Sequence, residues 1–309
     1  MKTPLTGRDF ISIADYDAAS FKYLLDLAID LKNKYINGIP HTLLSGKTLA
    51  MIFKKASTRT RVSFQAGMYH LGGLGMHLSV NELQVDRGEP VQDTARIIAS
   101  YCDGILIRTF DHQEALDLAR YSDKPVINGL TDDEHPTQAL ADIMTIYEEF
   151  GDLKGKRLAF IGDANNVLTS LAHACALSGM ELVLACPAGY RPGAKALAEY
   201  EAIKQPGSAF TITDDPKAAA EGADILYTDV WVSMGDEKQA GERLKAFQGY
   251  QINEGLIKLA KPNAIVMHDL PAHRGEEITD EAMECAQSRI FKQAGNRLHA
   301  HKAILAALL

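Results

Sequence analysis

Several short polar stretches in this sequence combine residue types that bind anions or move protons. In the first, residues 54–61 read KKASTRTR and follow an apolar run. A serine at the start of a helix is a good N-cap. The free backbone N–H groups at the start of a helix are also well suited to binding an anion. Arginine adds charge-assisted hydrogen bonds to phosphate oxygens. The stretch therefore predicts a site for a doubly charged phosphate, rather than an ordinary capped helix with a solvated arginine; its members are Ser57, Thr58, Arg59 and Thr60.

Two further polar segments follow apolar runs in the first half of the chain. Arg108 ends the run GILIR, and taken alone it is as consistent with a surface ion pair as with a ligand contact. His135 precedes Pro136 and stands three residues before Gln138, so His135 and Gln138 share one face of a helix that begins there. A single histidine at a helix start is more often a cap, and a catalytic reading requires Ser57 and Arg108 to lie nearby.

The second half has its own polar segments after apolar runs. Residues 162–167 (GDANNV) lack the GxGxxG fingerprint, and no acidic residue ends the next predicted strand, which excludes a standard dinucleotide site. Asn165 and Asn166 remain candidates for holding a polar ligand at a helix start. Residues 228–237 (TDVWVSMGDE) offer polar groups beside the single tryptophan, and the candidates there are Asp229, Ser233 and Met234.

The segment 267–275 (MHDLPAHRG) gathers four titratable or charged side chains directly after an apolar run. A metal site, an acid–base pair and a solvated turn are all compatible with that composition. The residues concerned are His268, Asp269, His273 and Arg274.

Alternating apolar runs and amphipathic stretches are typical of βαβ units, so the elements that position these residues are two parallel-sheet domains. The glycine-rich, charged segment 148–157 is the expected boundary. Ligands bind outside the carboxyl ends of parallel strands, which predicts a cleft between two doubly wound α/β domains. The expected strands are 47–53, 75–79, 104–108, 125–127, 157–161, 181–185, 209–212, 224–227 and 264–267, and the expected helices include 14–35, 58–71, 90–100, 136–150 and 166–179.

Composition narrows the class of protein. The 309 residues carry a net charge of −8 and are 46% hydrophobic, which indicates a globular chain and argues against nucleic acid or an anionic membrane as the main partner. No signal-like N-terminus and no apolar run of about 18 residues is present, so we expect a cytoplasmic location. Cysteines without CxxC spacing predict reduced, packed thiols; these are Cys102, Cys175, Cys186 and Cys285.

The segments STRTR (57–61), HPTQ (135–138), DVWVSMGDE (229–237) and HDLPAHRGEEIT (268–279) together resemble the signature series of the ornithine carbamoyltransferases, within the aspartate/ornithine carbamoyltransferase family. The order and spacing match across essentially the whole chain. The resemblance implies a carbamoyl-phosphate domain (1–148, joined by a returning C-terminal helix, 292–309) and an ornithine domain (149–291). It also implies a homotrimer whose active sites lie at subunit interfaces, and carbamoyl transfer to ornithine in arginine biosynthesis, a chemistry that needs no metal or cofactor.

The resemblance also implies residue roles. Ser57, Thr58, Arg59 and Thr60 match the phosphate-cradling helix start; Arg108, His135, Gln138, Leu270 and Arg297 match further groups around carbamoyl phosphate. Gln84 matches a residue supplied by a neighbouring subunit. Asn166, Asp229, Ser233 and Met234 match ornithine contacts. The implied catalytic groups are Thr60, Arg108, His135 and Asp269.

This chain departs from the family pattern at two positions. Asp269 stands where the family loop usually has cysteine, and Gly295 stands where glutamate is common. An isolated carboxyl group, with a reference pKa of about 3.9 against about 8.5 for a thiol, is a poorer base near neutral pH. We therefore expect retained ornithine recognition with a lower turnover or an alkaline optimum. Two alternatives stay open: a paralogue that carbamoylates another amine, and a non-catalytic ligand-binding relative.

Overall fold

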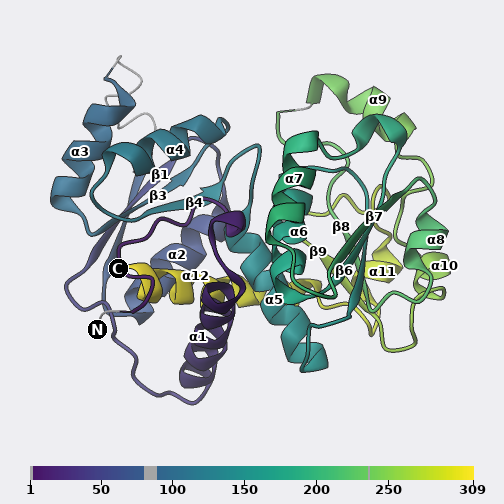
Figure 1. Ribbon diagram of the computed structural model, residues 1–309, viewed down its shortest axis with the longest axis horizontal. Helices are drawn as coiled ribbons and strands as arrows, with labels where there is room; N and C mark the ends of the chain where they lie inside the picture. Colours follow the sequence, from purple (N-terminus) through teal and green to yellow (C-terminus); the bar gives the residue numbers. More distant parts are fainter. Residues whose placement is uncertain (1–2, 80–88, 236) are drawn as a thin grey trace. The chain divides into compact units, whose positions relative to one another are not determined.

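The computed structural model describes residues 3–79, 89–235 and 237–309. The chain divides into two compact units, Met1–Met144 with Asn296–Leu309, and Thr145–Gly295. Each unit is built on a sheet of parallel strands with helices packed on it (Figure 1). The predicted class, two parallel-sheet α/β domains with a C-terminal helix that returns to the first domain, is confirmed. Within the described parts of the chain, no helix is long and apolar enough to span a membrane.

The sheet of the first unit contains β1 (Thr48–Phe53), β2 (Leu74–Ser79), β3 (Gly104–Arg108) and β4 (Val126–Leu130) in the order β2-β1-β3-β4. After β1 the chain adds β2 on one side and then adds β3 and β4 on the other. The strand order therefore reverses between β1 and β3. In open α/β sheets, ligands bind at the carboxyl ends of the strands at such a reversal.

Strand β4 is longer than the 125–127 expected from the sequence, because a polar residue is accommodated inside it. Asn128 donates from Nδ2 to the carbonyl of Ile11 over 3.0 Å. Gly129 sits where a Cβ atom would lie only 3.2 Å from the carbonyl oxygen of Ile107. A segment that reads as a turn thus continues the strand, since its polar group is paired and its glycine permits close approach of the chain.

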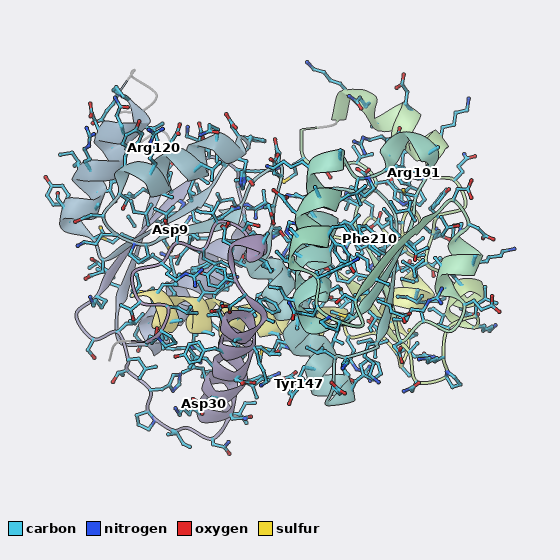
Figure 2. The ribbon with its side chains drawn as sticks, viewed as in Figure 1. Asp9, Asp30, Arg120, Tyr147, Arg191 and Phe210 are labelled. Atoms are coloured by element: carbon cyan, nitrogen blue, oxygen red, sulfur yellow. The ribbon has the colours of Figure 1, made fainter. Side chains whose placement is uncertain are left out.

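Helices cover both faces of this sheet (Figure 1). Buried aliphatic residues of β1, β3 and β4 form a core with α3 and α4. Asp9, labelled in Figure 2, accepts a hydrogen bond from the backbone of Val126 over 2.8 Å and so fixes the N-terminal segment beside β4. The helices are α1 (Ala18–Ile36), α2 (Thr58–His70), α3 (Val91–Tyr101), α4 (His112–Tyr121) and α5 (Pro136–Phe150), with a 3-10 turn at Ile13–Asp15.

The last helix, α12 (Ile290–Leu308), packs closely against α2 of the first unit. Gly67 of α2 permits this, because a Cβ atom there would already lie 3.4 Å from the side chain of Lys302. The helix begins two residues before the predicted start at 292. Its close packing brings residues from the end of the sequence against the start of α2.

The sheet of the second unit has the order β7-β6-β5-β8-β9, all parallel. After β5 the chain adds β6 and β7 on one side, and then β8 and β9 on the other. The reversal therefore lies between β5 and β8. The strands are β5 (Arg157–Ile161), β6 (Glu181–Ala185), β7 (Ala209–Thr213), β8 (Ile225–Thr228) and β9 (Ile265–His268).

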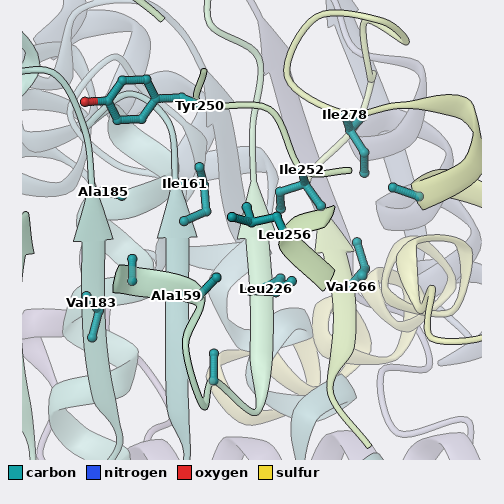
Figure 3. Close-up of a cluster of buried hydrophobic side chains, with 14 of the residues drawn as sticks. Ala159, Ile161, Val183, Ala185, Leu226, Tyr250, Ile252, Leu256, Val266 and Ile278 are labelled. Carbon is teal, nitrogen blue, oxygen red and sulfur yellow. The ribbon is translucent and has the colours of Figure 1, made fainter. Parts of the chain in front are cut away.

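Alternate residues of the central strands of this sheet build the core of the unit. Figure 3 shows Ala159, Ile161, Val183, Leu226 and Val266 pointing into one apolar cluster. On the edge strand β7, Phe210, labelled in Figure 2, places its ring 5.3 Å from that of Tyr200. The helices of this unit are α6 (Asn166–Ser178), α7 (Ala194–Ile203), α8 (Pro216–Ala220), α9 (Ala240–Ala246), α10 (Glu254–Ile257) and α11 (Asp280–Glu284), with 3-10 turns at Ala188–Tyr190 and Glu237–Gln239.

Candidate active site

The start of α2 lies at the strand reversal of the first sheet, directly after β1. Ser57 is the N-cap, and its hydroxyl accepts a hydrogen bond from the backbone N–H of Thr60 over 3.2 Å. The other N–H groups of the first turn have no carbonyl partner within the helix. Together with the helix dipole they form a site suited to an anion.

Thr60 joins two arginines that come from distant parts of the sequence. Arg108, at the end of β3, donates from Nη1 to Thr60 Oγ1 over 3.3 Å. Arg297, on α12, donates from Nη2 to the same oxygen over 2.7 Å. Thr60 is fully buried, and both arginines are nearly so. The fold therefore concentrates positive charge beside the start of α2, where a phosphate group would gain charge-assisted hydrogen bonds.

His135 is buried next to this positive charge. Burial, followed by the charges of Arg297 and Arg108, holds its pKa well below the usual range of histidine. The imidazole is therefore neutral at physiological pH. A neutral imidazole has one N–H donor and one acceptor nitrogen, so it can donate to a carbonyl oxygen without carrying charge itself.

Gln138 lies in the first turn of α5, and its backbone N–H donates to the carbonyl of His135 over 3.1 Å. Gln138 Nε2 donates to Asp142 Oδ1 over 2.8 Å, and both side chains are buried. This leaves the amide oxygen facing away from the carboxylate, and among the described residues that oxygen has no hydrogen-bond partner. Asp142 fixes which way the amide points. The sequence offers a hint of this pairing in the i, i+4 spacing of the two residues.

A cavity of about 970 Å³ lies beside the start of α2. It is lined by Ser57 and Thr58 together with residues from the ends of β1 and β2, including Lys54 and His77. The buried Thr60 and His135 are not part of its wall. The cavity therefore reaches the first residues of the α2 start but not the buried groups around Thr60.

The reversal of the second sheet also carries paired polar side chains. Asn165 caps α6 through its Oδ1, which accepts from the backbone N–H groups of Val167 and Leu168. Its Nδ2 donates to Asp229 Oδ2 over 2.7 Å. Asn165 thus joins the start of α6 to Asp229, the residue that directly follows β8. The sequence left Asn165 and Asn166 both as candidates, and only the family resemblance pointed to Asn166; the contact to Asp229 is made by Asn165.

Asp229 is 5% exposed, and Asp269 is 9% exposed. Burial and then the charge of Asp269 raise the pKa of Asp229 to about 7. Two carboxyl groups with little access to water disfavour a second negative charge. This region of the second unit is therefore suited to a cationic group of a ligand, such as an ammonium.

The loop that carries Asp269 is fixed by a buried histidine. His268 Nδ1 accepts a hydrogen bond from the backbone N–H of Leu270 over 2.8 Å. Its Nε2 lies 2.9 Å from Glu277 Oε1, and both side chains are fully buried. Since Nδ1 accepts, the proton of the imidazole is on Nε2 and is donated to the carboxylate. His268 is therefore a neutral positioning group.

Three further residues hold this loop, and sequence reasoning missed all of them. The backbone N–H of His268 donates to Gln293 Oε1 over 3.0 Å, and Gln293 Nε2 donates to the hydroxyl of Tyr227 over 2.9 Å. Glu277 also accepts from the backbone N–H of His273 over 2.6 Å. Of the three, only Glu277 lies within a motif noted from the sequence, HDLPAHRGEEIT (268–279). Leu270, at the turn of the loop, has a left-handed backbone with φ 67°.

The remaining predicted residues are placed as follows. Asn166 is the first residue of α6, and Ser233 and Met234 lie in the turn after β8, where Met234 is about half exposed. Gln84 lies outside the described residues. Arg274, one of the four charged or titratable side chains of the 267–275 segment, forms ion pairs with Asp280 and Glu284, each at 2.7 Å.

A possible cation site in the second unit is weak. Ligand atoms of His273, Glu276 and Glu277 lie within 4.8 Å of one another. However, Glu277 Oε1 already accepts from two N–H groups, and His273 and Glu276 face solvent. This group is better explained as an acidic turn that supports the loop.

Comparison with known protein families finds a matching domain model for each half of the chain. The carbamoyl-P binding domain model of the aspartate/ornithine carbamoyltransferases matches residues 8–148, and the Asp/Orn binding domain model matches residues 154–308. The chain belongs to the aspartate/ornithine carbamoyltransferase family. The suspected resemblance is thereby confirmed.

The chain matches individual members of this family over its full length. It is 52% identical over 306 residues to the ornithine carbamoyltransferase of Anoxybacillus flavithermus, which covers 99% of this chain and 98% of the relative. It is 49% identical over 311 residues to the anabolic ornithine carbamoyltransferase of Pyrococcus furiosus, covering 100% of this chain and 98% of that protein. The solved structure of the ornithine carbamoyltransferase from Pyrococcus furiosus matches with a TM-score of 0.96, at 47% identity, and covers 100% and 98% of the two chains.

Proposed function

We propose that this carbamoyltransferase family member moves the carbamoyl group of carbamoyl phosphate to the side-chain amine of L-ornithine, which gives L-citrulline and phosphate. The names of its relatives support this activity over the full chain length. The observation that carries the choice of ornithine is that two buried carboxyl groups, Asp229 and Asp269, directly follow the neighbouring strands β8 and β9. A buried carboxyl pair favours an ammonium side chain and repels the second carboxylate of aspartate.

The groups around Thr60 account for the carbamoyl half of the reaction. When the amine attacks the carbonyl carbon, negative charge develops on the carbonyl oxygen, and Thr60, Arg108 and His135 are the donors that stabilise it. Pre-arranged donors of this kind are worth roughly 3–4 kcal/mol each. The neutral state of His135 suits it to donate while the surrounding arginines supply the charge.

The departing phosphate gains charge during the same step. The start of α2, with Ser57 and Thr58, supplies backbone N–H groups and hydroxyls to its oxygens. Arg59 and Arg297 supply guanidinium groups. In this assignment Gln138 orients the carbamoyl amide through the oxygen that Asp142 leaves free, and Leu270 is assigned to carbamoyl phosphate binding.

In the second unit, Asp229 and Asp269 hold the side-chain amine of ornithine. Asn166, Ser233 and Met234 hold the α-amino acid end. This assignment explains why the loop at 268–271 is so heavily supported, because small displacements of a reacting group cost large factors in rate.

We also propose that the protein acts in arginine biosynthesis in the cytoplasm and assembles as a homotrimer, with Gln84 reaching a neighbouring site. Large exposed apolar side chains of the first unit support self-association. They are Val62 and Tyr69 on α2, Leu74 on β2, and Ile97 and Tyr101 on α3, each at least 52% exposed. Light scattering coupled to size exclusion tests the assembly: a monomer mass contradicts it.

One assay tests the activity. Purified protein is incubated with carbamoyl phosphate and, separately, ornithine, putrescine, acetylornithine or aspartate. We expect citrulline from ornithine and little product from the other amines. A preference for another amine supports the paralogue alternative. Binding of a phosphate analogue without product from any amine supports the ligand-binding alternative, and either result contradicts the proposal.

A further inference from the structure

Asp229 and Asp269 occupy equivalent positions at the ends of neighbouring strands. β8 and β9 are parallel, and Thr228 pairs with His268 in their register. Asp229 and Asp269 are each the next residue along the chain. Neighbouring strands lie about 4.8 Å apart, so the backbone at the two residues leaves the sheet edge side by side, and the charge of Asp269 acts on Asp229.

The charge of Asp269 raises the pKa of Asp229 more than any single neighbouring group lowers it. Asn165 binds one oxygen of Asp229 but is uncharged. His268 donates from Nε2 to Glu277 and accepts at Nδ1, so it is neutral and its proton is directed away from the pair. Asp163, two residues before Asn165, is itself paired with Arg243 at 2.7 Å. Asp269 is therefore the charged group that acts most directly on Asp229.

Two adjacent carboxyl groups out of contact with water do not both ionise in the range expected for aspartate. The second proton leaves the pair only at a higher pH, and its apparent pKa belongs to the pair. We propose that Asp229 and Asp269 act as a single carboxyl pair, which shares one proton in the free enzyme and, when fully ionised, accepts a proton from the ammonium group of the amine substrate. The identity of that substrate rests on the proposed function.

The pH at which the pair ionises determines whether it is useful as a base. Burial and the charge of Asp269 raise the pKa of Asp229 to about 7. A general base is most effective when its pKa is close to the working pH. The pair is therefore a stronger base than the isolated carboxyl group expected from Asp269 alone.

The proton transfer itself is simple. The ammonium group binds to the ionised pair, one N–H bond breaks, and one carboxyl O–H bond forms. The electron pair of the broken bond stays on nitrogen, which becomes the nucleophile. The pair then carries one proton and one negative charge, and the proton is later returned to solvent.

The shared proton can be detected without any substrate. Infrared spectra recorded from about pH 5 to about pH 9 follow the C=O band of a protonated carboxyl group, in a range where an ordinary aspartate, with a pKa of about 3.9, is already ionised. We expect the wild-type protein to lose one such band near pH 7, the value to which the pKa of Asp229 is raised. In Asp269→Asn the band should disappear at least about one pH unit lower, since the neighbouring charge is gone. An unshifted band in this variant overturns the proposal.

Asp163→Asn is the matched control, because it removes a buried carboxylate of the same unit that is already paired with Arg243. Its spectrum should keep the wild-type band. If the band is lost in Asp163→Asn and kept in Asp229→Asn, the proton is on Asp163. That result overturns the proposal. Circular dichroism identifies any variant that has not folded, and Asp269→Asn and Asp229→Asn then serve as independent tests.

Kinetics provide the second readout. We expect kcat/KM for ornithine to fall on the acid side of about pH 7 in the wild type, and this limb to move to lower pH in Asp269→Asn. An acid limb at the same pH in both proteins contradicts the base role. If the wild type forms no citrulline while its infrared band titrates as expected, the proposed function fails and the shared proton stands.

Discussion

Arg297 donates a hydrogen bond to Thr60 over 2.7 Å, although 237 positions separate the two residues in the sequence. The contact joins the last helix to the start of α2, and Arg108 donates to the same hydroxyl. One threonine oxygen thus sets the positions of two guanidinium groups that we assign to the carbamoyl phosphate site.

Replacing Thr60 with valine keeps the shape of the side chain but removes the acceptor. Hydrogen bonds to charged groups are worth about 1.5–3 kcal/mol. We therefore expect kcat/KM for carbamoyl phosphate to fall about 10- to 100-fold, measured by initial rates at saturating ornithine. Thr137→Val is the matched control, because Thr137 is equally buried and its hydroxyl has no partner among the described residues. Equal losses in both variants would indicate a general packing effect.

Glu277 should control the position of the loop at 268–271. Glu277→Ala removes the acceptor for His268 and for the backbone of His273. Unpaired buried polar groups cost about 1–3 kcal/mol each, so we expect a clear loss of unfolding free energy in urea and a raised KM for ornithine. Glu277→Gln, which keeps an acceptor oxygen, should restore part of both. Glu276→Gln changes the neighbouring exposed carboxylate and should resemble wild type; similar losses in this control would argue against a specific role of Glu277.

Acidic pH should destabilise the protein through two buried histidines. Burial, and the charge of Arg297, lower the pKa of both His135 and His301 well below the usual value. Below about pH 6.5 the unfolded chain binds protons that the folded protein does not, so stability falls as pH falls. Each histidine contributes at most about 1.4 kcal/mol per pH unit.

Urea unfolding at a series of pH values below neutrality tests this pH dependence. His301→Gln should have a shallower dependence than wild type, because one of the two titrating groups is missing. A dependence as steep as that of wild type would show that His301 is not responsible.

The buried Lys302 should act in the alkaline range. Burial lowers its pKa to about 8, and its Nζ donates to the carbonyl of Leu31 over 3.1 Å. Between about pH 8 and the unfolded value of about 10.4, the unfolded chain binds more protons, so this group makes stability rise with pH. Lys302→Met should lose that component. Thermal unfolding of both proteins at pH 8 and pH 10 measures it, and parallel changes in the two proteins would contradict it.

The sequence correctly predicted the elements that depend on local interactions. Ser57 is the cap of α2, as its type and position indicated, and the apolar runs are the strands of two parallel sheets. Strand β4 was predicted too short, because the sequence cannot show that Asn128 is paired with Ile11. Asn165 and Asn166 were equivalent in the sequence, and only the bond to Asp229 distinguishes them.

By itself the sequence determined the two-domain parallel architecture, the family and the residue types at the ends of the strands. These follow from apolar periodicity, helix capping and motif order, which are properties of neighbouring residues. The tertiary structure decided that Arg297 reaches Thr60, that His135 is neutral, and that Asp229 stands beside Asp269. Such features depend on burial and on strand order, which bring together groups far apart in the chain and remove the water that would otherwise screen their charges.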